Sequence, residues 1–225
     1  MAEVNPRSDF LAARPPWVHN VVRLSTSISQ PPCYQMVDLI VHEARLLLNL
    51  GDSEEALQVA NEALQLARAN NLEPMANSLV WALHAVAFTA LSYGDHKCAL
   101  EAAQEGCDVC ASSDWQNIEG EHNAFIRPSM LAFRSSAEAN LGRCQSALEY
   151  AHQAIHTSLD IRHKKLDVLA TTSEQSYMET RGNLADILLA SGDLAQARQI
   201  CEERRAYFSK RVDRRMGEYR ELVHQ

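Results

Sequence analysis

Residues 46–67 read LLLNLGDSEEALQVANEALQLA, and the expected architecture of the whole chain follows from them. An apolar run with the spacing of a helix stops at Gly51 and Asp52, and a second helix-periodic run, rich in alanine, begins directly after them. Glycine can adopt the positive φ that ends a helix, and aspartate can cap the start of the next one. This stretch therefore predicts an antiparallel helical hairpin.

The same signal returns three times, as LSYGDHKCALEAAQEG, NLGRCQSALEYAHQAI and LASGDLAQARQICEER. When the four copies are aligned on their turn glycines, small residues fall at fixed distances from the turn, which two closely packed helices require. The turn glycines are Gly51, Gly94, Gly142 and Gly192. The small residues are Ala44, Ala87, Ser135 and Ala185 before the turn, then Ala56, Ala99, Ala147 and Ala197, and finally Ala63, Gly106 and Ala154, where Arg204 breaks the series.

This combination of a small residue, a large apolar residue, a Gly-Asp turn and two alanines resembles the tetratricopeptide repeat (TPR) family over roughly residues 35–210. The turn glycines are 43, 48 and 50 residues apart, more than the ~34 residues of the standard unit. Long-unit members such as kinesin light chain and certain bacterial regulators look similar in this respect. The resemblance implies an all-α fold, a right-handed α-α superhelix of about four helical hairpins with a long C-terminal helix.

The domain organisation that we expect has three parts. A proline-containing leader occupies residues 1–32 and is either partly disordered or a short helix. A C-terminal helix extension or cap occupies residues 211–225. Between them lie the repeats, at about residues 33–72, 73–113, 127–163 and 173–210.

Composition favours a cytoplasmic protein. At 225 residues and 46% hydrophobic, the chain can bury a continuous core. It has no apolar run of the ~18 residues that a membrane span needs, and its N-terminus lacks the basic-then-apolar order of a signal peptide. Its six cysteines are scattered and mostly within helical patterns, which fits a reducing compartment better than a disulfide framework.

The net charge of −8 is unevenly distributed, because the last helix is basic while the rest of the chain is acidic. A mainly acidic body argues against general nucleic-acid binding, which needs a basic surface. We interpret the basic cluster, which includes Arg211, Arg214 and Arg215, as intrahelical ion pairs in a capping helix. Docking of an acidic partner on this helix stays open as an alternative.

The sequence carries no motif that indicates catalysis, a cofactor or a metal. Cys107 and Cys110 have CxxC spacing, but the repeat alignment puts both at positions that are packing positions in most copies, where a thiol acts as a small hydrophobe. His152 and His156 lie four residues apart on a face that the alignment predicts to be exposed, without a metal-binding motif. No glycine-rich phosphate loop or GxSxG turn is present. We therefore expect a non-enzymatic protein without cofactor or metal.

The resemblance also indicates where a partner would bind. In tetratricopeptide arrays the first helix of each hairpin lines a concave groove that holds an extended or helical peptide. Asn and Ser in this groove can bond a peptide backbone, while Trp81 and Phe88 supply apolar anchorage. The positions that the resemblance places in the groove are Asp38, Val41, His42, Arg45 and Asn49; Trp81, His84, Phe88 and Ser92; Ser129, Ala132, Ser136 and Asn140; and Glu179, Asn183 and Asp186.

The function that we expect is a protein-interaction scaffold that binds a partner peptide or helix in this groove, with no membrane partner. Two alternatives remain open. The chain can be a regulatory module that senses a peptide or a small ligand, as some long-unit relatives are, or its basic C-terminal helix can be the binding surface.

Overall fold

The computed structural model describes residues 33–69, 75–111, 126–163 and 170–223, so the leader expected at residues 1–32 lies outside the described residues. Within these ranges the secondary structure is α-helix, without strands. The helices are α3 (Cys33–Asn49), α4 (Ser53–Ala69), α5 (Met75–Tyr93), α6 (His96–Ala111), α8 (Ile126–Asn140), α9 (Cys144–His163), α10 (Ala170–Ser191) and α11 (Leu194–Val223).

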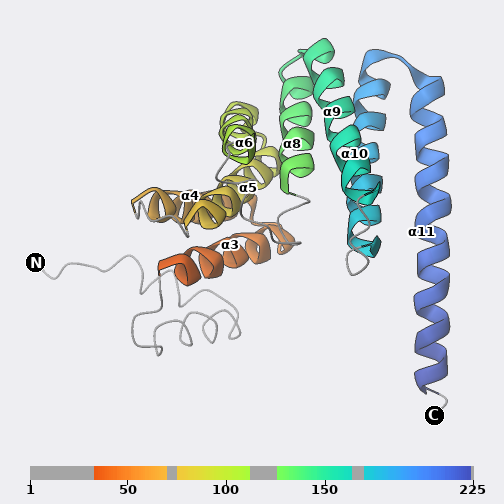
Figure 1. The fold of residues 1–225 in the computed structure, drawn as a ribbon, viewed down its shortest axis with the longest axis horizontal. Helices are drawn as coiled ribbons and strands as arrows, with labels where there is room; N and C mark the ends of the chain where they lie inside the picture. Colours follow the sequence, from red (N-terminus) through yellow and green to blue (C-terminus); the bar gives the residue numbers. More distant parts are fainter. Residues whose placement is uncertain (1–32, 70–74, 112–125, 164–169, 224–225) are drawn as a thin grey trace, which may run out of the picture.

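The helices form four antiparallel hairpins, α3–α4, α5–α6, α8–α9 and α10–α11, stacked in chain order. Each helix packs against the next, and Figure 1 shows the stack running from α3 at one end to the long helix α11 at the other. A continuous core joins α3 to α8, and a second cluster joins α9 to α11. The predicted fold class, an all-α solenoid of about four hairpins with a long C-terminal helix, is confirmed.

Each hairpin turn has the same hydrogen-bonded form. In the first turn, Gly51 has φ +90°, its N–H donates to Leu48 O at 3.0 Å, and Asp52 N–H donates to Leu47 O at 3.0 Å. This is the Schellman arrangement, in which a left-handed residue satisfies the last carbonyls of a helix. Asp52 Oδ1 then accepts the N–H of Glu55 at 3.2 Å, as a helix cap. The predicted roles of glycine and aspartate are confirmed here.

The third turn differs from the others because Arg143 stands where they have aspartate. Arg143 N–H still donates to Glu138 O at 2.9 Å, so the backbone of the turn is unchanged. Its side chain instead forms an ion pair with the buried Glu138 carboxylate at 3.1 Å. This pair gives the buried carboxylate the partner that it needs.

The small residues of the repeat pattern lie at the helix crossings. Ala44, Ala56 and Ala63 are all fully buried, and so are their counterparts in the second hairpin. A Cβ added at Gly106 would overlap the side chain of Met130, which is itself fully buried. The helices α6 and α8 therefore cross closely at Gly106, and a side chain there would require Met130 to move.

Arg204 breaks the small-residue series, and the structure shows how the fold accommodates it. The Arg204 guanidinium lies directly over Gly182 of α10, where a Cβ would meet it. In this hairpin the large residue, Arg204, is on α11 and the small residue, Gly182, is on α10, so the two helices can still pack closely. An ion pair between Arg181 and Glu203 holds the same pair of helices together.

The stack curves toward the first helices of its hairpins. The first helices α3, α5, α8 and α10 each contact the next first helix, whereas in the described ranges the second helices make at most marginal backbone approaches to one another. Between α4 and α6 the gap is bridged at the surface by the Arg68–Glu105 ion pair. Layers that are closer along one edge curve around that edge, so the first helices lie on the inner face.

Candidate functional site

The inner face is formed by α3, α5, α8 and α10, and most of the expected groove positions are accessible there. On α3, Asp38, His42, Arg45 and Asn49 are all exposed. Partial burial raises the pKa of the Asp38 carboxyl, an effect that the nearby His42 partly offsets. The predicted groove positions on α3 therefore present charged and polar groups to solvent.

Two of the expected groove positions are wrong. Val41 and Ala132 are each only 4% exposed and belong to the core. Both stand ten residues before a turn glycine. An inner helix contacts its own partner and the neighbouring hairpins, so on α3 and α8 this position packs against another helix, whereas His84, at the same position of α5, is only half-buried.

Aromatic side chains cluster on the inner face of α5 and α8. The His84 ring lies 5.7 Å from the Trp81 ring and 4.9 Å from the Phe133 ring, in a T-shaped contact with the latter. Phe133 and Phe88 stack at 5.7 Å with an interplanar angle of 25°. These four residues form one surface, which we call the aromatic strip. Such geometries are favourable for aromatic pairs.

His84 lies at the centre of this strip and stays uncharged at neutral pH. Burial and, to a smaller extent, the positive charge of Arg45 together lower its pKa to about 4. Desolvation disfavours the charged form of an imidazole, and a nearby cation does the same. The charge of Arg45 on α3 is therefore within electrostatic range of His84 on α5.

The structure thus brings together Arg45, Trp81, His84 and Phe88, which the sequence assigned to the groove on two separate hairpins. Sequence reasoning missed Phe133, although a signal was present. Phe133 stands nine residues before Gly142, the same position that gave His42 and Asn183 as groove residues in other copies. Applying that position to every copy would have found it.

The remaining expected groove positions are polar residues outside the aromatic strip. Asn140 is exposed and Ser136 is half-buried, and Asn140 Nδ2 donates to Ser136 O at 2.8 Å. On α10, Asn183 is half-buried and Asp186 is exposed. Ser92 donates to its own helix at Phe88 O, and Ser129 is half-buried. The side chain of Glu179 lies outside those that the structure describes.

The cysteine and histidine pairs do not form a reactive centre in the described part of the chain. Burial raises the pKa of Cys107 to about 11 and that of Cys110 to about 12, so both are thiols at neutral pH. His152 and His156 are both exposed, and His156 Nδ1 lies 3.3 Å from Asp160. Among the described residues, no three His, Cys, Asp or Glu side chains are placed to hold a metal. No helix in the same ranges is both long and apolar enough to cross a bilayer.

Comparisons with known proteins identify the type of fold. Residues 37–70 match the tetratricopeptide repeat family model. No curated protein matches the chain in sequence. A kinesin light chain-type protein of Podosopora anserina with nearly identical TPR-like repeats is similar in structure, with a TM-score of 0.58, 20% identity, and coverage of 87% of this chain and 85% of that one.

The apo form of RapI is also similar, with a TM-score of 0.62 and 14% identity. The match covers 86% of this chain and 63% of RapI, so this chain spans only part of that protein's length. At these identities the likeness concerns the fold alone. The chain therefore carries a tetratricopeptide repeat at residues 37–70 and folds as a TPR-like helical solenoid.

Proposed function

We propose that this chain is a non-catalytic protein-interaction scaffold, which binds an extended or helical segment of a protein partner along α3, α5 and α8. The observation that carries this proposal is the aromatic strip with Arg45 beside it, on three successive first helices. Solenoids use their concave faces as extended binding surfaces, and an apolar strip with a flanking charge suits a peptide.

The apolar part of the surface is centred on Phe88 and Phe133. Phe88 is 37% exposed although it is a large aromatic residue, and its stack with Phe133 spans α5 and α8. Rigid aromatic side chains are frequent energetic centres of protein interfaces, because they bury large areas at little entropic cost. A large aliphatic or aromatic side chain of the partner would cover this stack.

The polar part is Arg45. Its side chain is exposed, and the neighbouring His84 is neutral near pH 7, so Arg45 supplies the positive charge beside the strip. A guanidinium pairs well with a carboxylate, which it can hold through two hydrogen bonds. The partner segment should therefore carry an acidic residue close to its apolar anchor.

The basic terminal helix is the weaker candidate. Arg198 pairs with Glu202 at 2.8 Å, and Glu203 pairs with Arg181 of α10. Arg211 Nη1 donates to the Tyr207 hydroxyl at 3.1 Å. The first pair neutralises one basic residue of α11, and the second joins α11 to α10, which favours the interpretation of α11 as a capping helix.

A cytoplasmic location is part of the proposal. Five cysteines in the described ranges are free, and three of them, Cys98, Cys107 and Cys110, have a pKa raised mainly by burial. Unpaired thiols suit a reducing compartment. Fractionation of cells that express the tagged chain would test this location.

The function is tested with peptides selected against the purified chain from a displayed random library. We expect the selected peptides to carry an acidic residue near an aromatic or large aliphatic one. The affinity of these peptides, measured by fluorescence polarisation, should fall on the order of tenfold or more in each of Phe88→Ala and Phe133→Ala, as for interface centres. Arg45→Gln should reduce it and also weaken its salt dependence.

Tyr93→Ala is the matched control, because Tyr93 is an exposed aromatic residue at the end of the same helix, 49% accessible. It should leave the affinity unchanged. If Phe88→Ala, Phe133→Ala and Arg45→Gln all bind the selected peptides as tightly as the unaltered chain, the groove is not the binding site. If Arg205→Ala with Lys210→Ala abolishes binding instead, the terminal helix takes its place.

A further inference from the structure

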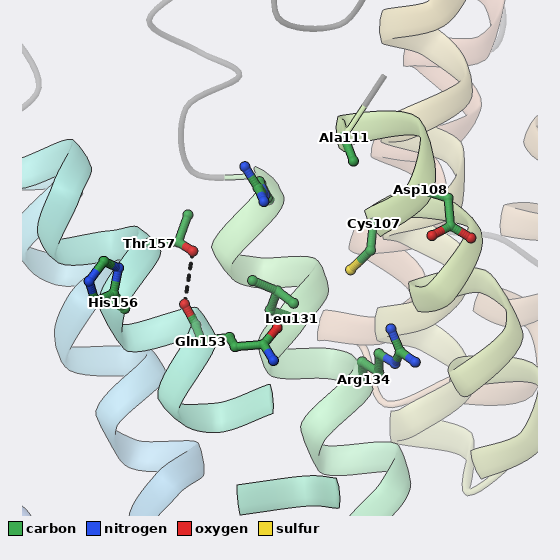
Figure 2. Close-up of a pocket in the computed structure, with 9 residues that line it drawn as sticks. Cys107, Asp108, Ala111, Leu131, Arg134, Gln153, His156 and Thr157 are labelled. Atoms are coloured by element: carbon green, nitrogen blue, oxygen red, sulfur yellow. Dashed lines mark hydrogen bonds between the residues drawn. The ribbon is translucent and has the colours of Figure 1, made fainter. Parts of the chain in front are cut away.

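A cavity of about 330 Å³ opens on the opposite side of α8 from the aromatic strip, between the second helices α6 and α9. Figure 2 shows its lining on three helices, with Cys107 and Asp108 on α6, Leu131 and Arg134 on α8, and Gln153, His156 and Thr157 on α9, and with the Cys107 sulfur directed toward Leu131. The curvature explains why space exists here, because second helices separate where first helices are in contact. The other lining residues are Ala111 and Arg127.

The floor of this cavity is apolar and well packed. Leu131 is 7% exposed and packs in one cluster with Ala132 and Ala154, against which Cys107 and Tyr150 are also packed. The crossing of Gly106 and Met130 holds α6 against α8 beside the cavity. The walls are therefore fixed by the core of the solenoid, which is typical of preformed small-molecule sites.

The charged groups in the lining are unbalanced. Arg127 and Arg134 both carry a positive charge toward Cys107, where they act against the effect of burial on its pKa. Neither arginine forms an ion pair with the described residues. The acidic group of the lining, Asp108, accepts a hydrogen bond from Gln104 at 2.9 Å, and His156 pairs with Asp160.

The Arg134 side chain contacts an aromatic ring, but one of its hydrogen-bond donors has no partner among the described residues. Its guanidinium carbon lies 3.8 Å from the centre of the Tyr150 ring, a cation–π contact that restrains the group. Its Nε is buried and has no hydrogen-bond partner among the described residues. A buried donor without an acceptor is costly, and a fixed, planar guanidinium is prearranged for an oxyanion.

We propose that this cavity binds a small organic anion, in which a phosphate or carboxylate group meets Arg127 and Arg134 while an apolar group rests on Leu131. The volume is at the lower end of the range for small-molecule sites, roughly 300–1,000 Å³, which suits a ligand of about the size of one aromatic ring with its anionic group. The site is separate from the peptide groove and does not depend on the proposed function.

Isothermal titration of the full chain with phenyl phosphate, benzoate and the neutral benzamide tests the proposal. We expect saturable binding of at least one of the two anions and weaker binding of benzamide. The phosphate and carboxylate arms identify which oxyanion is preferred. Equal binding of all three probes, or no saturable binding of any at low-millimolar concentration, overturns the proposal.

Arg127→Met and Arg134→Met should each weaken binding of the preferred anion on the order of tenfold, as expected for loss of a charge-assisted hydrogen bond. Arg134→Lys should bind the anion more tightly than Arg134→Met but less tightly than the unaltered chain, because lysine lacks the planar guanidinium group. Arg127 is exposed, so its substitution does not threaten folding. Arg205→Met, an exposed arginine on α11, is the matched control, and an effect as large as that of Arg127→Met contradicts the proposal.

Cys107 reports the location of the bound probe. Alkylation at alkaline pH, followed by mass spectrometry, should be slowed at Cys107 by the anion and unchanged at the exposed Cys201. Binding without protection of Cys107 overturns the assignment to this cavity. The Phe88→Ala and Phe133→Ala variants should bind the probe as the unaltered chain does, so failure of this proposal and failure of the groove proposal are distinguishable.

Discussion

The ring of His84 is packed among aromatic side chains beside a fixed positive charge, and this has a consequence for stability. Its pKa is about 4 in the folded chain, below the ordinary value of 6.5. Between these values the unfolded chain binds a proton at this residue and the folded chain does not. The free energy of unfolding therefore decreases as the pH falls from 6.5 toward 4.

We expect the His84 contribution to reduce the free energy of unfolding by about 2 kcal/mol between about pH 7 and about pH 5, and His84→Gln should remove this part of the loss. Urea unfolding at the two pH values measures it. Arg45→Gln should retain most of the loss, because burial is the larger cause of the lowered pKa. A loss in His84→Gln as large as in the unaltered chain would contradict the assignment.

Two helical glycines that look alike in sequence should respond differently to alanine. Gly106→Ala should lower the free energy of unfolding by roughly 1–2 kcal/mol, because the new Cβ overlaps the fully buried Met130 and overpacking outweighs the gain in helix propensity. Chemical denaturation gives the difference. An unchanged or increased stability would mean that Met130 has room to move.

Gly182→Ala is the counterpart. Here the Cβ meets the guanidinium at the end of the Arg204 side chain, on the terminal helix, and that group can swing away. The helix-propensity gain of up to about 1 kcal/mol should then leave stability unchanged or slightly raised. A large loss would show that the position of Arg204 is fixed by the fold.

At the scale of the element, the caps of the second helices are equivalent in three hairpins. Asp95→Ala should cost about 1 kcal/mol of stability, because Asp95 Oδ1 accepts the N–H of Cys98 at 3.1 Å at the start of α6. Asp186→Ala, an exposed aspartate within α10, is the control in urea unfolding and should change little. Equal effects of the two would show that the cap contributes nothing specific.

Element patterns also explain how far the sequence could be interpreted. The turns and small-residue positions were predictable, because each depends on local chemistry repeated in four copies. The inner faces were only partly predictable. α5 buries residues around most of its circumference, so hydrophobic periodicity does not distinguish its groove side from its packing sides. Val41 and Ala132, on α3 and α8, were misassigned because the repeat register alone does not show which positions pack against a neighbouring helix.

Other features depend on pairs of residues that are distant in the sequence. The exchange of small and large residues between Gly182 and Arg204 becomes visible only when α10 and α11 are placed together. The cavity at Arg134 likewise depends on the separation of α6 from α9, which is a property of the curvature. Neither leaves a motif in a single segment of the chain.

At the scale of the whole molecule, α11 closes the stack and packs on α10, and Figure 1 shows it continuing well past the end of that helix. In a solenoid each hairpin depends mainly on its neighbours. Ending the chain after residue 211 should therefore keep the thermal transition close to that of the full chain, as followed by circular dichroism. Selected peptides should bind the shortened chain unchanged.

Ending the chain after residue 192 is the comparison. This removes Ala197 and Ile200, which complete the core cluster around α10, and should destabilise the fourth hairpin. If the two shortened chains are equally stable, α11 does not act as a cap. If the chain that ends after residue 211 loses peptide binding, the basic residues beyond residue 211 form part of the binding surface.

Phe133 and Arg134 are consecutive residues of α8, yet one faces the aromatic strip and the other the cavity. Successive residues of a helix project about 100° apart, so less than a third of a turn of α8 separates the two surfaces. If a ligand in the cavity changes the affinity of the strip for a peptide by some factor, the peptide must change the affinity of the cavity for that ligand by the same factor.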